Sequence, residues 1–519
     1  MLVKTFGSAV HGIDAITITI EVDVTQGMKY FMVGLPDNAV KESQQRIEAA
    51  LKNSGFRMPR MRVVVNMAPA DIKKAGSAYD LPIAIGILAA SGQMLANEPE
   101  GGQGILSQYV IMGELSLDGS LQPIRGALPI AIQARKEQFK GFILPRQNAR
   151  EAAMVNRLEV YGMSHIKEVV DFLEGKTHPE PLKIDTREEF FHAQQTFAED
   201  FSDVKGQEHI KRAMEIAAAG GHNVILIGPP GAGKTMLAKR LPTILPPLTL
   251  QEALETTKIH SVAGKLPVDA TLIAHRPFRA PHHTISDTAL VGGGSIPQPG
   301  EISLAHNGVL FLDELPEFKR SVLEVLRQPL EERRVTISRA KVAIEFPASF
   351  MLVASMNPCP CGYFNHPEKA CTCPPGAVQK YLSRISGPLL DRIDLHVEVT
   401  PVPFLQLSSS QETEKSTSIR ERVIRARQIQ QQRYQDYPGI YCNAQINSTL
   451  LKKYCIIPQA GMQLLKTAME RLHLSARAYD RILKVARTIA DLEESENIQI
   501  QHVAEAIQYR SLDRENWGA

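Results

Sequence analysis

The stretch NVILIGPPGAGKT, residues 223–235, decides the fold of this chain. Its first five residues predict a buried strand, and residues 236–241 after it predict a helix. Between them runs the pattern G-x-x-x-x-G-K-[ST]. The strand–loop–helix context distinguishes a phosphate-binding loop from the alternative, an ordinary glycine-rich turn. We therefore expect an α/β core built on a parallel sheet.

The residues of this loop would have complementary tasks in binding the phosphates of a nucleotide. Glycines allow the backbone to wrap around phosphate groups, and the N–H groups at the start of the following helix point toward the anion. The amine of Lys234 would neutralise β- and γ-phosphate charge, and the hydroxyl of Thr235 would bind Mg²⁺. The predicted cofactor site comprises Gly228, Pro229, Pro230, Gly231, Ala232, Gly233, Lys234 and Thr235.

Two further apolar segments end in polar residues that suit the same site. Residues 308–311 (GVLF) come shortly before Asp313 and Glu314, and residues 349–354 (SFMLVA) come shortly before Asn357. The carboxyl ends of parallel strands meet at one edge of a sheet. We expect Asp313 to hold Mg²⁺ through water, Glu314 to activate the attacking water and the amide of Asn357 to orient it. An ordinary pair of strand-end acids is the alternative.

The chain has 519 residues, which suggests about three domains. Its 58 Lys and Arg against 56 Asp and Glu leave a formal charge of +2, so any nucleic-acid surface must be local. The longest apolar stretch, residues 81–90, is about half of the roughly 20 residues that a membrane span needs, and the N-terminus forms no secretory apolar region. We expect a cytoplasmic protein without membrane contact.

Changes in composition divide the chain into four parts. Residues 1–175 alternate strand-like and helix-like segments, residues 176–200 form a linker with one short helix, residues 201–406 hold the phosphate loop, and residues 407–519 are helical. The expected elements are strands at 15–24, 62–66 and 141–144, helices at 38–54 (capped by Asp37) and 128–136, and C-terminal helices at 419–434, 460–472, 476–493 and 500–511.

Four of the six cysteines follow the pattern C-x-C-x9-C-x-C just after Asn357. Cys359, Cys361, Cys371 and Cys373 supply two close pairs of thiolates, which can complete a tetrahedral Zn²⁺ site. Reduced, metal-free thiols are the alternative. An iron–sulfur cluster is disfavoured because the spacing matches neither common ferredoxin pattern. We expect bound Zn²⁺.

Residues 331–346 (EERRVTISRAKVAIEF) alternate on both sides of Arg339 and Lys341, which predicts a hairpin with a basic tip. These two side chains are candidate contacts to DNA phosphates, which do not depend on base sequence. A solvated charged turn is the alternative. A second candidate surface is the insert at residues 259–300, which carries Arg276, Arg279, His282 and His283.

Several segments resemble motifs of AAA+ ATPases. Residues 201–207 (FSDVKGQ) are similar to the segment that covers the adenine, which implies a nucleotide contact for Gln207, and Asn357 matches the sensor-1 position. Residues 389–396 (LLDRIDLH) look like the element that delivers an arginine finger to the neighbouring subunit. By this resemblance Arg392 is the finger.

Three further segments extend the resemblance. Residues 474–480 (LSARAYD) look like the start of a lid helix with Arg477 as the sensor-2 arginine. With residues 278–283 (FRAPHH) and 290–294 (LVGGG), the chain resembles the magnesium-chelatase-like AAA+ ATPases of the ComM/YifB subfamily over nearly its whole length. The resemblance implies a hexameric homo-oligomer with the basic hairpin in its central pore.

The two arginines also have simpler interpretations. A salt bridge with Asp391 or Asp394 would explain Arg392 structurally, because such ion pairs are common. A solvated arginine at a helix end would explain Arg477.

The N-terminal part resembles Lon-type protease domains. Residues 113–124 (GELSLDGSLQPI) are similar to a strand–turn–strand segment of that α+β fold, and residues 76–81 (GSAYDL) are similar to the loop that carries its serine nucleophile. A serine nucleophile needs a base, and Leu128 occupies the position of the Lon lysine. We expect Ser77 to be inactive and the Lon-like domain to serve as a scaffold, assembly or nucleic-acid module.

The resemblance implies an ATPase and DNA helicase, acting on branched, single-stranded or duplex DNA. Its leading task would be branch migration in homologous recombination during natural transformation. A motor subunit of a metal chelatase and a protein-remodelling or proteolytic machine are the alternatives. The cysteine cluster and the Lon-like domain disfavour the chelatase, and Leu128 disfavours proteolysis.

Overall fold

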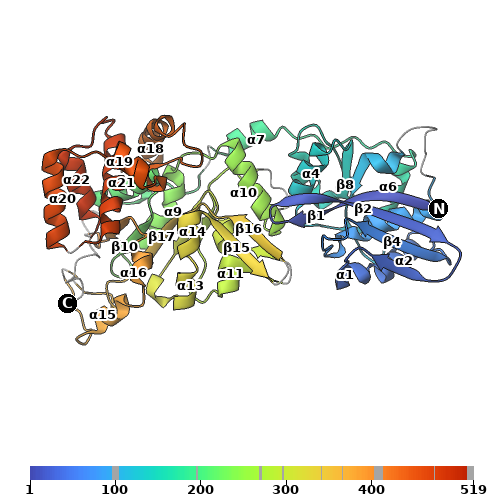
Figure 1. Ribbon diagram of the computed structural model, residues 1–519, viewed down its shortest axis with the longest axis horizontal. Coiled ribbons are helices and arrows are strands. Elements are labelled where there is room, and N and C mark those ends of the chain that lie inside the picture. The colour runs from blue at the N-terminus through green and yellow to red at the C-terminus, as the bar shows by residue number, and fades with distance from the viewer. Residues whose placement is uncertain are drawn as a thin grey trace.

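The computed structural model of this chain describes residues 1–95, 104–194, 197–267, 272–294, 297–339, 342–364, 366, 368–402, 413–472 and 474–510, with 339 and 342 described by their backbone alone. The molecule is elongated (Figure 1). A mixed sheet lies at one end, a helical bundle at the other, and a parallel sheet between them.

Seven strands in the order β3-β4-β2-β1-β5-β8-β9 form the N-terminal sheet. β1 and β2 pair antiparallel, whereas β5, β8 and β9 run parallel, so the domain is of the mixed α+β kind. The strands are β1 (Leu2–His11), β2 (Asp14–Thr25), β3 (Tyr30–Val33), β4 (Arg62–Ala68), β5 (Tyr109–Ile111), β8 (Gly141–Pro145) and β9 (Glu159–Met163), with a small hairpin of β6 (Glu114–Leu115) and β7 (Leu121–Gln122). The helices are α1 (Asn38–Lys41), α2 (Ser43–Asn53), α3 (Asp80–Ala90), α4 (Ala127–Lys136), α5 (Arg146–Ala153) and α6 (Ile166–Leu173).

Local chemistry accounts for the helices of this domain. Every residue of α3 is buried, so the longest apolar run is a core helix. The expected helix at 38–54 is divided into α1 and α2 at Glu42. Asp37 is the predicted cap, and its carboxylate accepts a hydrogen bond from the backbone N–H of Val40 at 2.8 Å.

The central sheet is parallel throughout, in the order β11-β14-β17-β10-β18. Its strands are β10 (Val224–Ile227), β11 (Phe278–Arg279), β14 (Val309–Leu312), β17 (Met351–Met356) and β18 (Leu395–Glu398). Around it lie α8 (Glu208–Gly220), α9 (Lys234–Ile244), α10 (Leu250–Val262), α11 (Asp287–Val291), α12 (Glu301–Leu304), α13 (Arg320–Glu324), α14 (Arg327–Glu332), α15 (Ala377–Leu382) and α16 (Gly387–Leu390), with the short pair β12 (Gly292–Gly293) and β13 (Gln298–Pro299). The expected α/β core is confirmed. Since all strands point the same way, their carboxyl ends share one edge.

The predicted hairpin is present as β15 (Arg334–Arg339) and β16 (Val342–Pro347), which pair antiparallel. It extends from the central part toward β1 and β2 (Figure 1). A Cβ placed on Gly12, in the turn between β1 and β2, would lie 3.4 Å from the side chain of Ile344. The N-terminal sheet therefore touches the hairpin directly.

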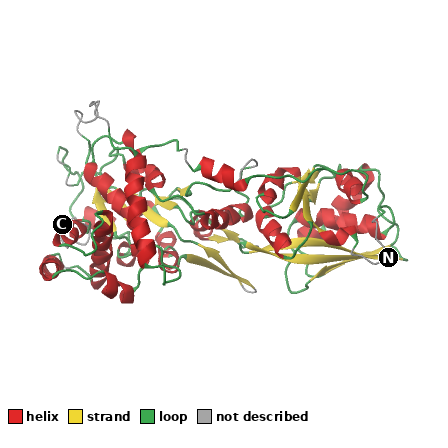
Figure 2. Cartoon of the chain, turned by 90° about the horizontal axis from the view of Figure 1, so that it is seen from above, coloured by secondary structure: helices red, strands yellow, loops and turns green. Residues whose placement is uncertain are grey.

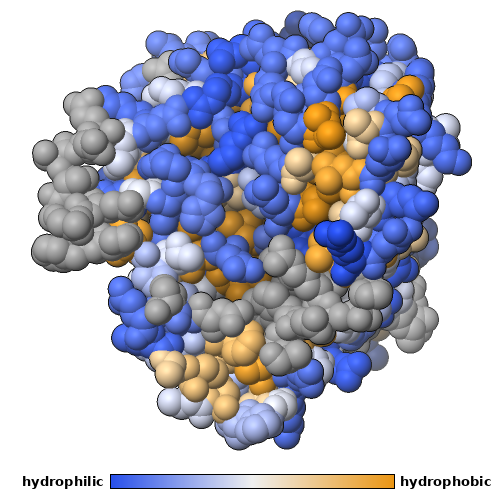
Figure 3. All heavy atoms as spheres, turned by 90° about the vertical axis from the view of Figure 1, so that its left-hand side faces the viewer, coloured by the Kyte–Doolittle hydropathy of each residue, from blue (hydrophilic) through white to orange (hydrophobic). Residues whose placement is uncertain are grey.

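The C-terminal bundle contains α18 (Ser416–Arg433), α19 (Ser448–Tyr454), α20 (Gln459–Arg471), α21 (Ala476–Leu492) and α22 (Ile500–Gln508). The predicted helices are present, and the short α19 is an addition. α18 packs on α8 and α9, and α21 packs on α8. Figure 3 shows this end of the molecule, where hydrophilic side chains surround smaller apolar areas. In the linker, α7 (Thr186–Ala193) is the one short helix expected, and it lies between the two ends of the molecule (Figure 2).

No helix within the described residues is long and apolar enough to cross a membrane.

Candidate active site

The phosphate loop follows β10 and has the backbone that its glycines predict. Gly231 and Gly233 have φ of 79° and 86°, in the left-handed region that favours glycine. Gly228 is needed for space, because a Cβ there would lie 2.3 Å from the carbonyl oxygen of Val399. The start of the loop therefore lies against Val399, the residue that follows β18. The loop then leads directly into α9.

Lys234 lies buried at the start of α9, with its amine inside the loop. Its Nζ donates to the carbonyl oxygens of Gly228 at 2.7 Å and Pro229 at 2.9 Å, and to Oδ1 of Asn357 at 3.0 Å. Burial lowers the pKa of Lys234, against the opposing effect of the nearby acids Asp313 and Glu314. The structure thus brings the predicted sensor amide to the phosphate loop.

The two predicted Mg²⁺ residues lie side by side. Oγ1 of Thr235 donates to Oδ2 of Asp313 at 3.0 Å, and the hydroxyl of Ser355 donates to the other carboxylate oxygen of Asp313. Two oxygens that share one octahedral Mg²⁺ at about 2.1 Å each lie about 3 Å apart. The donor set and spacing of Thr235 and Asp313 therefore fit a magnesium ion, directly or with one intervening water.

Glu314 adopts an unusual backbone conformation beside this pair. Its φ is 54°, and its N–H donates to Oδ1 of Asp313 at 3.1 Å and to Oγ of Ser355 at 3.3 Å. The carboxylate is about half exposed and lies 3.6 Å from Nδ1 of His283. This geometry turns the Glu314 side chain away from the strand, toward the open side of the site.

Sequence reasoning missed two residues of this site. Ser355 bonds Asp313 and the N–H of Glu314. It lies near the carboxyl end of β17, directly after the expected segment 349–354, and could have been found by the rule that placed Asn357. His283 belongs to the insert at residues 259–300, and the structure places it beside Glu314. Nothing local in the sequence indicates this contact, because 31 positions separate the two residues.

Gln207 connects the start of α8 to the phosphate loop. Its Nε2 donates to the carbonyl oxygen of Thr400 at 2.9 Å and to that of Ala232 at 3.2 Å. Its backbone φ is 58°. The side chain therefore lies at the nucleotide site, and its contact with the adenine stays a prediction.

Arg392 lies on the opposite edge of the same sheet. Its side chain is mostly buried, donates to the carbonyl oxygen of Pro388 at 2.5 Å and forms an ion pair with Glu331. The expected alternative partners, Asp391 and Asp394, are not its partners. Arg392 precedes β18, whereas the phosphate loop follows the carboxyl end of the neighbouring β10. Within one chain, Arg392 therefore does not approach its own phosphate loop.

Arg477 lies near the same edge. Its side chain is 63% exposed, and its guanidinium lies 2.9 Å from the carboxylate of Asp391. Asp394, the other acid of this motif, is buried and pairs with Arg481 at 2.9 Å. Burial raises the pKa of Asp394, but the Arg481 charge and the other partners of the carboxylate lower it more, so the pKa lies below its usual range. The predicted finger and sensor-2 arginines therefore lie together, away from the nucleotide site of their own chain.

The four clustered cysteines converge after β17. Cys359, Cys361, Cys371 and Cys373 present Sγ atoms that all lie within 4.8 Å of one another, so the expected cluster forms. Cys442 and Cys455 lie apart from it and are buried.

Two candidate DNA surfaces have different outcomes. The side chains of Arg339 and Lys341 lie outside the described residues. In the insert, Arg276 donates to the carbonyl oxygens of Pro246 at 2.6 Å and Asn307 at 2.7 Å. Arg279 forms two hydrogen bonds with the carboxylate of Glu301, at 2.6 and 2.7 Å. Both guanidinium groups are thus engaged within the chain, so the insert offers a weaker phosphate surface than its composition indicates.

The N-terminal domain shows no serine–lysine pair at the expected position. The Ser77 hydroxyl donates to the carboxylate of Glu114, and Leu128 is fully buried.

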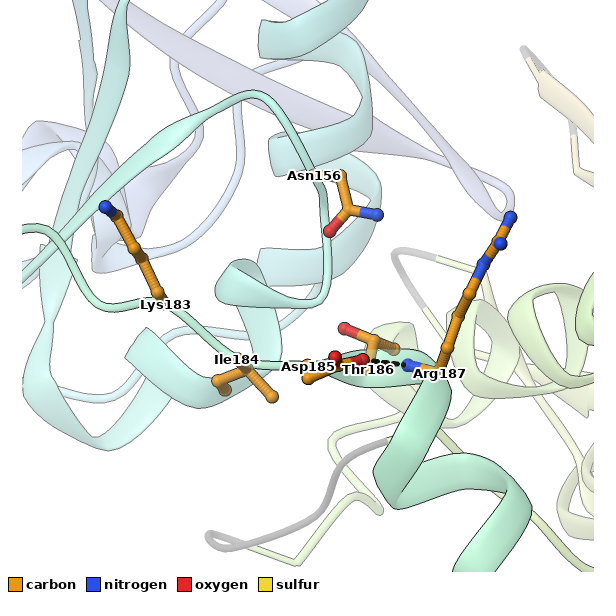
Figure 4. Close-up of a pocket in the computed structure, with 6 residues that line it drawn as sticks. All are labelled: Asn156, Lys183, Ile184, Asp185, Thr186 and Arg187. Atoms are coloured by element: carbon orange, nitrogen blue, oxygen red, sulfur yellow. Dashed lines mark hydrogen bonds between the residues drawn. The ribbon is translucent and has the colours of Figure 1, made fainter.

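A separate pocket lies on the linker. It is lined by Asn156, Lys183, Ile184, Asp185, Thr186 and Arg187, and the carboxylate of Asp185 accepts from the backbone N–H of Arg187 at the start of α7 (Figure 4). It shares no residue with the phosphate loop.

The chain matches three families of one protein type. Residues 20–148 match "Subunit ChlI of Mg-chelatase", residues 200–407 match "Magnesium chelatase, subunit ChlI", and residues 413–510 match "Magnesium chelatase, subunit ChlI C-terminal".

Relatives match over nearly the full length. Competence protein ComM of Haemophilus influenzae is 45% identical, over 99% of this chain and 98% of ComM. YifB of Salmonella typhimurium is 44% identical, over 98% of this chain and 96% of YifB. Lon protease 2 of Bacillus subtilis is 33% identical over 27% of this chain and 26% of that protease. The chain therefore belongs to the magnesium-chelatase-like AAA+ ATPases, in the subfamily of ComM and YifB.

Proposed function

We propose that this chain is an ATP-driven motor that assembles as a hexameric ring and moves DNA through its pore. The observation that carries the ATPase is the meeting of Lys234, Asn357, Thr235 and Asp313 at one sheet edge. The competence relative supports DNA as the substrate. Branch migration of recombination intermediates during natural transformation is the task we assign.

The chain's own residues would divide the hydrolysis of ATP among them. Thr235 and Asp313 hold Mg²⁺, which when bound neutralises charge on the β- and γ-phosphates. Lys234 exchanges its two carbonyl partners for phosphate oxygens. Glu314 takes the proton of the attacking water, and Asn357 orients that water. His283 positions the Glu314 carboxylate through their 3.6 Å contact.

Two arginines would complete the site of a neighbouring subunit. Arg392 lies on the edge opposite to its own phosphate loop, and Arg477 pairs with Asp391 beside it. In a ring we expect both arginines to face the next protomer's nucleotide. Arg392 would leave Glu331 to reach the γ-phosphate. This arrangement would give the transferred phosphate an arginine from the neighbouring subunit.

The cysteine cluster would hold one Zn²⁺ in each chain. Four thiolates complete a structural site and leave no open position for substrate. We assign the metal a structural part in this function.

A motor subunit of a metal chelatase is the second candidate, and the three ChlI family matches favour it. The rate of ATP hydrolysis with and without single-stranded, duplex and branched DNA separates the two. We expect stimulation by DNA, strongest with branched DNA, and none in Lys234→Ala. An ATPase that no form of DNA stimulates would refute the DNA motor and leave the chelatase.

A further inference from the structure

We infer that the cysteine centre positions the nucleotide site: a metal ion held by its four thiolates keeps residues 357–362 against the phosphate loop, and ATP turnover depends on that ion. This inference rests on the proposed ATPase function. In this inference the structural metal also affects the rate of ATP hydrolysis, because it lies next to the phosphate loop.

The sulfur geometry suits a tetrahedral metal. Sγ of Cys359 lies 3.3 Å from that of Cys361 and 3.8 Å from that of Cys371, and the sulfurs of Cys361 and Cys371 are 3.5 Å apart. Four sulfurs at 2.3 Å from one zinc ion lie about 3.8 Å from each other. The thiols are thus gathered at close to the separation that a shared ion imposes.

The backbone around the first cysteine is also organised toward its sulfur. The N–H of Phe364 donates to Sγ of Cys359 at 3.3 Å, and the N–H of Gly362 donates to the carbonyl oxygen of Cys359 at 3.0 Å. Such N–H donors stabilise thiolate charge. Gly362 has a φ of 85° and directly follows Cys361, so it closes the turn that carries the first two ligands.

The same turn packs closely against the phosphate loop. A Cβ placed on Gly362 would lie 2.6 Å from Cδ of Pro230, the third residue of the loop. Just before the turn, Oδ1 of Asn357 accepts from Lys234 at 3.0 Å. The carbonyl oxygen of Met356 accepts from the N–H of Gly228 at 3.2 Å. One short segment therefore contacts the loop at three of its residues.

The rest of the cysteine segment has few other sources of order. Among its described residues, those from 358 to 376 form no helix or strand, and those from 368 to 376 are exposed or half-buried. A segment with so little apolar burial cannot offset its conformational entropy by packing. The metal is then what holds Cys371 and Cys373 to the first pair, and through it the turn on Pro230.

The test compares full-length variants by metal content and by catalysis. Cys371→Ser removes a ligand that does not touch the phosphate loop, and Cys442→Ala is the control that removes a buried cysteine outside the cluster. Gly362→Ala keeps all four ligands, places a Cβ 2.6 Å from Cδ of Pro230 and strains the turn at its φ of 85°. For each we would measure zinc per chain, thermal unfolding, the Kd of a fluorescent ATP analogue, kcat, and hydrogen exchange of residues 228–235.

We expect about one zinc per chain in the parent and in Cys442→Ala. Cys371→Ser should lose it, expose residues 228–235 to faster exchange, and lower kcat at least about tenfold, since displacement by about 1 Å can cost 10²-fold. Gly362→Ala should retain zinc and still lose kcat.

Three results would overturn the inference: no zinc in the parent purified without chelator, unchanged exchange in Cys371→Ser, or unchanged kcat in Gly362→Ala. Zinc content and exchange do not require turnover. A parent that binds zinc and shows the expected exchange but does not hydrolyse ATP would therefore refute the proposed function instead.

Discussion

Lys234 carries its charge where burial disfavours it, and its pKa is lowered for that reason. Its three hydrogen bonds to Gly228, Pro229 and Asn357 replace the water that burial removes. Two of these acceptors are carbonyl oxygens of the loop itself. An anion that enters the loop offers a stronger partner, so the amine is prepared for phosphate before ATP arrives.

At the residue scale, we predict different defects for Lys234 and Glu314. Lys234→Ala should weaken ATP binding, because the phosphate charge is no longer compensated. Glu314→Gln keeps the Thr235 and Asp313 pair and should bind ATP normally while hydrolysis falls by about 10² to 10⁴. The measurements are the Kd of a fluorescent ATP analogue and the kcat of each variant. Hydrolysis by Glu314→Gln at near the parent rate would show that another group activates the water.

The elements of the central part place this chemistry by their direction. Because β10, β14 and β17 are parallel, the residues that follow them meet at one edge, although more than 120 positions separate the first from the last. The hairpin of β15 and β16 leaves this layer and meets the turn between β1 and β2 at Gly12. The N-terminal sheet therefore contacts the hairpin through this turn.

At the element scale, we predict that the hairpin grips the DNA backbone. If Arg339 and Lys341 bind phosphates, affinity should fall with salt by a logarithmic slope of roughly 0.7 to 0.9 per contact. Arg339→Ala/Lys341→Ala should flatten that slope, weaken binding about equally for all sequences, and remove DNA stimulation while basal ATPase survives.

The matched control removes two charges elsewhere. Lys466→Ala/Arg471→Ala changes the net charge equally, on the exposed surface of α20. Fluorescence anisotropy across a salt series compares the variants. If the salt dependence of DNA binding is unchanged in the hairpin variant, another surface of the protein binds the DNA backbone.

At the scale of the whole molecule, the phosphate loop and the two predicted catalytic arginines lie apart. Its phosphate loop and Arg392 occupy opposite edges of one sheet, and Arg477 on α21 pairs with Asp391 near Arg392. If these arginines act on ATP as proposed, one chain cannot supply them to its own phosphate loop. We therefore predict that hydrolysis requires assembly.

At this scale, we predict complementation between subunits. Arg392→Ala should bind ATP with little change and lose hydrolysis by roughly 10³-fold or more, as for an arginine finger. Mixing it with Glu314→Gln should restore part of the activity, because some sites then take the glutamate from one chain and the arginine from another. Each variant alone is the control, and the ATPase rate across mixing ratios is the measurement. If the mixture is no more active than each variant alone, Arg392 has only a structural role, in its ion pair with Glu331.

By itself, the sequence determined the α/β core, the phosphate loop, the catalytic strand ends, the hairpin and most helices. These features depend on local chemistry: glycine where φ is positive, alternation in strands, and the direction in which a strand runs. The cysteine cluster was also readable, because its ligands lie within fifteen positions.

Only the tertiary structure decided which distant side chains meet. It placed His283 beside Glu314 and Arg392 on Glu331. It placed Arg276 on the carbonyl oxygen of Asn307, Arg279 on Glu301, and Gly362 against Pro230. A charged side chain can pair with any of several acids, and backbone propensity does not distinguish among them. The partner is chosen by packing, which brings together residues tens to more than a hundred positions apart and excludes the water that would otherwise solvate them.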